Sequence, residues 1–345
     1  MAQTNPGEPV SIPKFEMAPR DPVALSLGSQ GDFPTGIYKC SGDHSVFVTM
    51  ITTSTSRQIA TGFSLYAVRG PTDVVAYRSS VATGFRTMGP VYRYFAGESK
   101  VVALAWGLPL DSGDTGAPPD PKQSVPVLLT FDHKGALLSS KVLDRSLHPE
   151  QIGLFPSGEI LLLRWDRGRK LTVLEVLNDQ GSEEREIPMT ANDPADSSAP
   201  GGTALVTVEI YAWGNHLLLV PDSSSQAILE VSESGVVNTW TLHIPKGYER
   251  GVPVAFDSHR WMFRMDPEGK QGDTEAEMPF AERARIGEAK PTVVMEFDPS
   301  TGNPVRQFAF PAGLQPACEV DGEFLFLGAN PDDGKLQFAT ALMPN

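Results

Sequence analysis

The fold is decided by a hairpin pattern that is clearest in the stretch Leu154-Phe-Pro-Ser-Gly158-Glu-Ile-Leu-Leu-Leu163. A short apolar run, a tight turn that ends in glycine and a second apolar run predict two antiparallel strands. The same arrangement stands at Cys318-Glu-Val-Asp-Gly322-Glu-Phe-Leu-Phe-Leu327, and weaker copies begin at Cys40, Phe95, Tyr211 and Ala255. The aligned turns recur every 44 to 63 residues, at His44, Ser99, Gly158, Asn215, His259 and Gly322.

A second type of hairpin lies between these copies. It is clearest at Val127-Leu-Leu-Thr-Phe131-Asp-His-Lys-Gly135 and at Thr292-Val-Val-Met-Glu-Phe297-Asp-Pro-Ser-Thr-Gly302, and related runs end at Gly181 and Gly235. Two hairpins per repeat make four strands, which is the content of a propeller blade. The high content of turn formers, 32 Gly and 30 Pro in 345 residues, agrees with many short strands.

The chain contains five complete units and a sixth that stops one strand short. The apolar alternating run Pro22–Gly28 is the predicted missing strand, which would close the ring and remove an exposed sheet edge. We therefore predict an all-β, six-bladed β-propeller of four-stranded antiparallel blades over residues 22–345, after a polar N-terminal tail over residues 1–21. Two stacked β-sandwiches are the alternative architecture.

The repeat also resembles a known group of proteins. A proline, an apolar run and an Asp-Gly or Ser-Gly turn, followed by an apolar run and Phe131-Asp-His-Lys-Gly135, is similar to the six-bladed propellers of the NHL and TolB-like groups. The Asn-His-Leu signature of the NHL group occurs once, at Asn215-His216-Leu217. The resemblance spans Pro22 to Leu342 and implies the fold, not an activity.

Charge and hydropathy limit the partners. The chain carries 28 Lys and Arg against 42 Asp and Glu, a net charge of −14, which repels nucleic acid. Apolar runs such as Val101–Trp106 are far shorter than the ~18 residues that span a bilayer. We expect a monomer that binds a small ligand or a protein partner, with no nucleic acid and no membrane span. The polar, Pro-rich start fits a periplasmic or secreted protein whose signal was removed, and a cytoplasmic protein remains the alternative.

Loop lengths separate the two faces of the predicted disc. Successive turns of a meander alternate between the faces, so the long connections Gly107–Ser124, Thr190–Ala204 and Asp266–Lys290 all fall on one of them, here called the long-loop face. Residues 275–288 form the predicted helix of the chain. Binding residues concentrate on loops that a rigid scaffold holds, so we expect a ligand at this face. Flexible surface insertions are the alternative.

The innermost strands begin at the same face, around the mouth of the central channel. Their first residues, here called the mouth residues, are Tyr38, Arg93, Glu150, Gln151, Glu209, Glu249, Arg250 and Gln315. Carboxylates, guanidinium groups and amides of this kind bind a small polar ligand, or Ca²⁺ through oxygen ligands. Alternatively, they only solvate a water-filled channel.

Catalytic motifs point away from an enzyme. The sequence has no Gly-x-Ser-x-Gly, His-Glu-x-x-His, Walker-type or Gly-x-Gly-x-x-Gly pattern. We therefore predict a non-enzymatic binding module without a cofactor. The alternative is a metal-dependent hydrolase or lactonase similar to gluconolactonase-like propellers, with Glu150, Glu209 and Glu249 as ligands, although the asparagine of such sites has no counterpart. His44, His216 and His259 all fall at turns on the short-loop face. They could bind a metal ion there, or they could be present only because turns favour polar residues.

The two cysteines, Cys40 and Cys318, form no C-x-x-C pair. Each precedes the first turn of its blade by four residues, on the innermost strands of the first and last blades. These blades are neighbours if the ring closes, so we expect the two cysteines to lie close together. A disulfide across the seam and two buried free thiols both stay open, because a bridge needs Cα atoms within ~7 Å.

Overall fold

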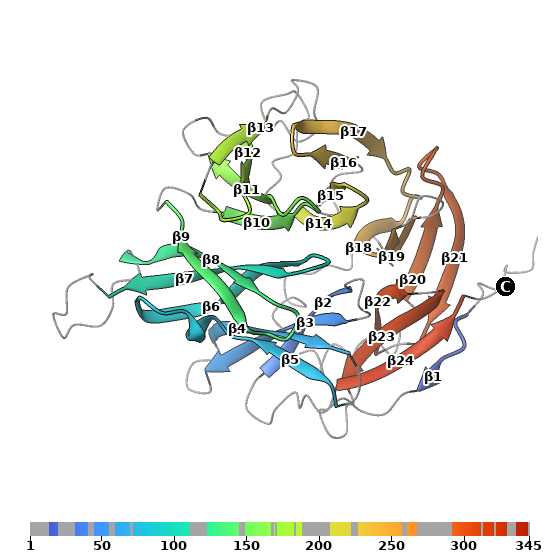
Figure 1. Ribbon diagram of the computed structural model, residues 1–345. Coiled ribbons are helices and arrows are strands. Elements are labelled where there is room, and N and C mark those ends of the chain that lie inside the picture. The colour runs from blue at the N-terminus through green and yellow to red at the C-terminus, as the bar shows by residue number, and fades with distance from the viewer. Residues whose placement is uncertain are drawn as a thin grey trace, which may run out of the picture.

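The predicted propeller is confirmed. The computed structural model describes residues 14–19, 32–40, 45–54, 59–69, 72–110, 123–144, 149–166, 169, 171–182, 184–187, 208–221, 227–256, 261–267, 292–311, 313–320, 322–329 and 336–343. Within these residues the strands form six four-stranded antiparallel sheets, which surround a common centre in Figure 1. Each sheet is one blade, and the blades are numbered first to sixth in chain order.

The strand bounds follow the predicted repeat. The first blade holds β2 (Asp32–Cys40), β3 (Val46–Ser54), β4 (Ile59–Val68) and β5 (Val74–Tyr77), and the second holds β6 (Phe85–Ala96), β7 (Val101–Pro109), β8 (Val125–Phe131) and β9 (Leu137–Val142). The third holds β10 (Pro149–Leu154), β11 (Ile160–Asp166), β12 (Leu171–Leu177) and β13 (Glu184–Ile187), and the fourth holds β14 (Val208–Trp213), β15 (His216–Pro221), β16 (Ala227–Ser232) and β17 (Gly235–Thr241). The fifth holds β18 (Tyr248–Phe256), β19 (Trp261–Pro267), β20 (Thr292–Phe297) and β21 (Pro304–Phe310). The sixth holds β22 (Leu314–Val320), β23 (Glu323–Ala329), β24 (Leu336–Leu342) and, from the chain start, β1 (Ala18–Pro19). A short 3-10 helix, η1 (Ser79–Val81), follows β5.

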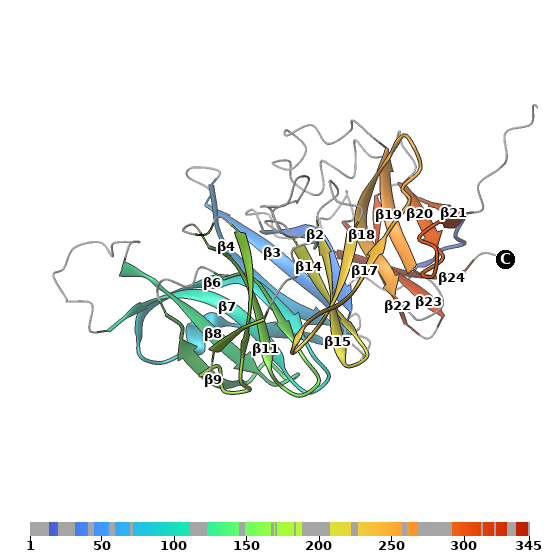
Figure 2. The ribbon, with the colours of Figure 1, turned by 90° about the horizontal axis from the view of Figure 1, so that it is seen from above.

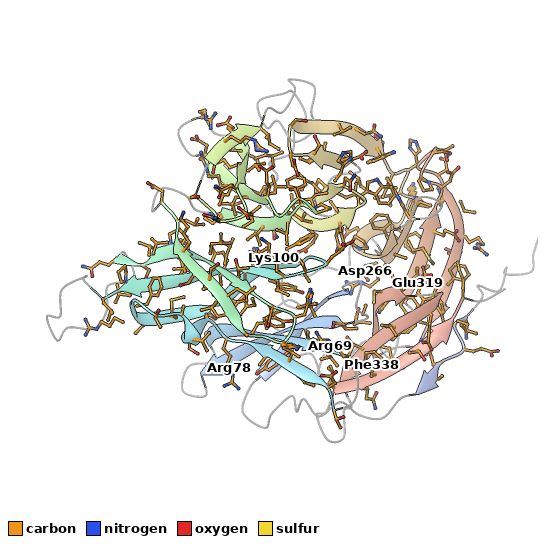
Figure 3. All side chains as sticks on the ribbon, viewed as in Figure 1. Arg69, Arg78, Lys100, Asp266, Glu319 and Phe338 are labelled. Atoms are coloured by element: carbon orange, nitrogen blue, oxygen red, sulfur yellow. The ribbon has the colours of Figure 1, made fainter. Side chains whose placement is uncertain are left out.

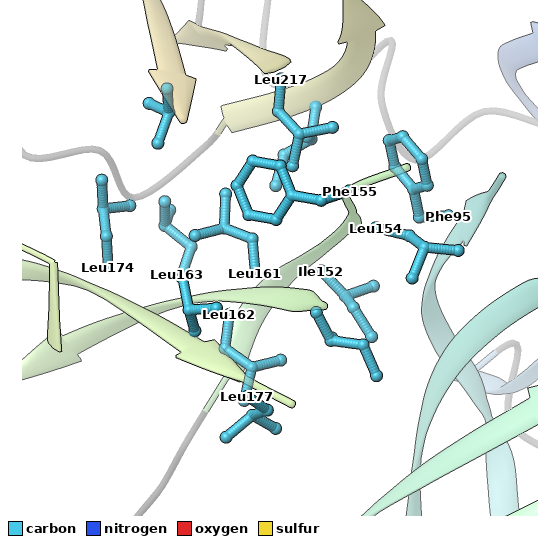
Figure 4. Packing of buried hydrophobic residues seen from close by; sticks show 14 of the residues in the cluster. Phe95, Ile152, Leu154, Phe155, Leu161, Leu162, Leu163, Leu174, Leu177 and Leu217 are labelled. Atoms are coloured by element: carbon cyan, nitrogen blue, oxygen red, sulfur yellow. The ribbon is translucent and has the colours of Figure 1, made fainter. Parts of the chain in front are cut away.

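The second strand of each blade is apolar on both faces because it lies between two other blades. In β11, Leu161 and Leu163 point toward Leu217 of the fourth blade, whereas Leu162 points the other way with Leu177 (Figure 4). All five side chains are 0–2% exposed. The core is therefore a ring of apolar layers, one between each pair of blades.

The turn between the third and fourth strands explains the Phe-Asp-x-x-Gly pattern. Asp132 Oδ1 accepts hydrogen bonds from the backbone N–H groups of Lys134 and Ala136, at 2.9 and 2.8 Å. Asn178 and Asp298 accept equivalent bonds in the third and fifth blades. A hydrogen bond from the Ser300 hydroxyl, and after it the one from the Ser300 N–H, holds the pKa of the exposed Asp298 carboxyl below its usual value. An aspartate or asparagine therefore closes each of the three turns.

The glycine of these turns contacts the preceding blade. A Cβ added at Gly135 would lie 2.7 Å from the carbonyl oxygen of Ala76, on the outer strand of the first blade, and one at Gly302 would overlap the carbonyl oxygen of Thr241 on the fourth. Both glycines also have positive φ, +81° and +67°. Left-handed backbone and close approach together require glycine here.

Gly302→Ala should lower the free energy of unfolding by about 3 kcal/mol or more, because the methyl group strains the backbone and overlaps the preceding blade. Gly322→Ala is the matched control, since φ is +83° and nothing lies within 4 Å of an added Cβ. We expect the control to cost about 1 kcal/mol, the strain of the backbone alone. Urea unfolding measures both variants, and equal losses would contradict the docking argument.

The sixth blade is completed by the chain start. β1 pairs antiparallel with β24, Ala18 opposite Thr340 and Pro19 opposite Ala339, so both ends of the chain share one sheet (Figures 1 and 2). The strand predicted for this place, Pro22–Gly28, lies outside the described residues. Residues 14–19, which the sequence assigns to the polar tail, pack on the last two blades.

The seam between the sixth and first blades carries the cysteines. The innermost strands β22 and β2 lie side by side, and Cys318 is disulfide-bonded. The sequence holds one other cysteine, Cys40. The prediction that Cys40 and Cys318 occupy the same position in their blades is wrong, because the two hairpins differ in register. Cys40 stands opposite the first residue of β3, and Cys318 stands opposite the third residue of β23. Val46, the register partner of Cys40, packs in one cluster with Cys318, so the offset brings the two positions to the same seam.

We predict that the unreduced protein in denaturant titrates no free thiol and that the reduced protein titrates two. Reduction should lower the unfolding free energy by about 4–5 kcal/mol, the loop-entropy value for a closed loop of this length. Ellman titration and urea unfolding measure the two effects. Two thiols before reduction would contradict a bridge between Cys40 and Cys318.

Candidate functional site

The mouth residues lie on the innermost strands, as follows. Glu150 and Gln151 on β10, Glu209 on β14, Glu249 and Arg250 on β18, and Gln315 on β22 are the second or third residues of their strands. Tyr38 on β2 and Arg93 on β6 are not first residues, as the sequence predicted, but lie in the second half of their strands, because β2 and β6 begin earlier, at Asp32 and Phe85. The side chains of Tyr38 and Arg250 lie outside the described part of the structure. So do the predicted helix over residues 275–288 and most of the three long connections. The site is therefore built from the remaining six residues and their neighbours.

Arg93 joins the second blade to the third. Its Nε donates to the backbone oxygen of Glu150 at 2.6 Å and its Nη1 to that of Tyr92 at 2.8 Å. Among the described residues, no carboxylate is in ion-pair contact with this guanidinium. Two carbonyl groups thus fix the direction of a cation without neutralising its charge.

Tyr92 and Trp106 form an aromatic wall beside Arg93. Their rings stack with an interplanar angle of 15° and centroids 5.7 Å apart, and the Tyr92 hydroxyl donates to the backbone oxygen of Pro149 at 3.3 Å. Burial raises the pKa of the Tyr92 phenol, against the lowering effect of Arg93, so the phenol stays neutral and a donor. The stack lies within the second blade, and the hydroxyl joins this blade to the third, as Arg93 does.

Glu150 is the described mouth carboxylate with a shifted pKa. Desolvation raises its pKa, and the nearby charge of Arg93 opposes that rise. The charged carboxylate is thus less stable in the folded protein than in water. Such a group gains from a ligand that supplies a hydrogen-bond donor.

Arg264 makes the corresponding link between the fifth and sixth blades. Its Nη1 donates to Gln315 Oε1, and its Nη2 donates to Asp266 Oδ2 at 3.0 Å. The Nε atom is buried without a hydrogen-bond partner in the described part of the chain. Asp266 lies toward the centre of the ring (Figure 3). Gly251 leaves room for this arrangement, since a Cβ there would lie 3.3 Å from Arg264 Nε.

Sequence reasoning missed Arg264 and Asp266 because it considered the first strands alone. The sequence does contain a signal for them. The pattern Arg-x-Asp recurs near the end of the second strand in two blades, at Arg164-Trp165-Asp166 and Arg264-Met265-Asp266. In the third blade this arginine has another role. Arg164 binds the buried Glu175, with Nη2 and Nε 2.5 and 2.7 Å from Oε1. The pair is an internal ion pair of the third blade, not part of the mouth.

Metal-ligand geometry is absent from the described residues. No three His, Cys, Asp or Glu side chains among them stand close enough to hold an ion, so Glu150, Glu209 and Glu249 do not form the trio expected for a hydrolase. On the short-loop face, His216 Nδ1 lies 2.5 Å from Glu230 Oε1, and His44 and His259 lie outside the described residues. The described part of the chain also contains no helix that is long and apolar enough to cross a membrane.

Comparison with known proteins shows a shared fold. The chain matches no protein-family model and no curated protein. A member of the DUF4221 family from Bacteroides vulgatus is similar, with 8% identity, a TM-score of 0.53, and coverage of 97% of this chain and 100% of that one. A neuraminidase-like protein of A/flat-faced bat/Peru is 9% identical, with a TM-score of 0.50 and 96% of each chain covered. TolB from Acinetobacter baumannii is 12% identical, with a TM-score of 0.42 and coverage of 89% of this chain and 66% of that one.

Glu150→Gln should raise the free energy of unfolding at pH 7 and leave it unchanged well below pH 4.5, the usual Glu value. A raised folded pKa means that folding is opposed by the ionised form, so the penalty appears as the pH rises. Glu186→Gln is the matched control, because the hydrogen bond from Arg169 lowers the pKa of Glu186 and its loss should destabilise at pH 7. Urea unfolding at both pH values measures the change in the free energy of unfolding of each variant. Changes of the same sign for both variants at pH 7 would contradict the prediction.

Proposed function

We propose that this protein is a non-enzymatic binding module, which engages a small polar ligand or a protein partner at the mouth of its channel on the long-loop face. The observation that carries the proposal is the pair of arginines at opposite seams of the ring. Arg93 reaches from the second blade to Glu150 of the third, and Arg264 from the fifth blade to Gln315 of the sixth. Each guanidinium is held by groups of the neighbouring inner strand.

Rigid donors favour binding because little side-chain entropy is lost when a ligand arrives. Arg93 adds a charge that no described carboxylate contacts directly, in a protein with a net charge of −14. Glu150 adds a carboxylate whose raised pKa reflects poor solvation. A ligand with both an acceptor and a donor group satisfies the two side chains together.

The disulfide bears on the compartment in which the protein works. Disulfides persist in oxidising environments and are rare in the cytosol. Because Cys318 is disulfide-bonded, we propose that the protein works in the periplasm or after secretion, as a monomer.

The test is a thermal-shift screen with small carboxylates, sugars and short peptides as probes, and Ca²⁺ as a separate arm. A probe at about 100 times its Kd stabilises the folded protein by about 2.7 kcal/mol. We expect this shift to disappear in Arg93→Ala. It should persist in Arg185→Ala, the control, which removes an ion pair with Glu159 outside the mouth.

Equal shifts in both variants would place the ligand elsewhere, and no shift with any probe would contradict binding of small molecules of these classes. A shift with Ca²⁺ alone, together with a divalent ion in elemental analysis of the purified protein, would support the metal-dependent hydrolase instead.

A further inference from the structure

The N-terminal segment Lys14–Pro19, here called the clasp, crosses the seam between the fifth and sixth blades. At one end Lys14 forms a parallel bridge with Ala309 of β21, and the Phe15 N–H donates to the Ala309 oxygen at 3.1 Å. At the other end Ala18 and Pro19 pair with β24. The clasp therefore adds backbone pairing to the outer strands of two different sheets, and β1 lies beside β24 at the rim in Figure 1.

One side chain anchors the clasp. Phe15 is 4% exposed, and its ring lies 5.0–5.8 Å from the rings of Phe308, Phe310, Phe324 and Phe326. Lys14, Glu16 and Ala18 are exposed, and Met17 is half-buried. The apolar contact of the clasp is thus concentrated in a single aromatic ring.

The pocket around Phe15 is built by the blades themselves. Phe308 and Phe310 come from β21, and Phe324 and Phe326 from β23, which are strands of regular sheets. Phe310 and Phe326 also touch each other across the seam, with centroids 5.5 Å apart. Two neighbouring blades thus form an aromatic pocket flanked by strand edges that accept an extended chain.

We propose that this seam is a peptide-binding site, which the protein fills with its own clasp and which takes an extended peptide carrying Phe three residues before Ala-Pro. Backbone pairing with a sheet edge, together with one side-chain pocket, is an established mode of peptide recognition. The covalent link keeps the clasp at high local concentration, so it outcompetes a free peptide of the same sequence. Removal of the anchor opens the site to a peptide in trans.

The test uses the full-length protein with Phe15→Ala, and a fluorescent synthetic peptide with the sequence of residues 12–20. Loss of the buried ring should lower the Tm by about 5 °C. The peptide should bind this variant saturably and restore most of the Tm. It should bind the wild-type protein at least tenfold more weakly, because the clasp occupies the site. Glu16→Ala, an exposed change in the same segment, should behave as wild type.

A peptide with Phe replaced by Ala is the negative control and should not bind. Failure of the natural peptide to bind a folded Phe15→Ala protein would overturn the proposal, and so would equal binding to the wild-type protein. If Phe15→Ala does not fold, a protease site inserted between Pro22 and Gly31 of the wild-type chain replaces it. After cleavage the clasp peptide should stay bound through gel filtration and be displaced by the labelled peptide. Immediate loss of the cleaved clasp would overturn the proposal.

Discussion

A sheet that is apolar on both faces cannot stand alone in water, and every other feature of this molecule depends on that constraint. The second and third strands of the blades bury side chains in both directions, as β11 does with Leu161 and Leu162. Each blade needs a neighbour on either side, and a row of such blades leaves two uncovered faces at its ends. Closing the row into a ring is the arrangement that covers them all.

Contacts at the turns keep the blades in register. The aspartate or asparagine of the third turn shapes the loop, and its glycine brings the loop against the backbone of the preceding blade, as Gly135 does at Ala76 and Gly302 at Thr241. A backbone contact tolerates no added side chain, so it defines the spacing of two blades more sharply than apolar packing can. The rigid ring that results fixes the positions of the polar groups on the inner strands.

Closure leaves the last two seams dependent on contacts that cross them. At the seam of the sixth and first blades the constraint is covalent, through Cys318. At the seam of the fifth and sixth blades it is Phe15, together with Arg264 bound to Gln315 nearer the axis. The second of these seams is held without a covalent bond, which is why an exchangeable peptide site belongs there rather than at the disulfide. The mouth, by contrast, draws its rigidity from hydrogen bonds between neighbouring blades, from Arg93 to Glu150 and from Arg264 to Gln315.

The sequence by itself determined the hairpins, the number of blades and the all-β class, because turn residues and apolar runs act over a few residues and repeat along the chain. It also located Arg93, Glu150 and Gln315 on inner strands. The tertiary structure alone decided which of these residues meet, because they come from blades that are far apart in sequence and their contacts depend on the closed ring. It brought in Arg264 and Asp266 from a second strand, and it offset Cys40 and Cys318 by register because their hairpins differ in length. It also buried Phe15, which the sequence assigns to a polar tail, in an aromatic pocket, because that pocket exists only where two blades join.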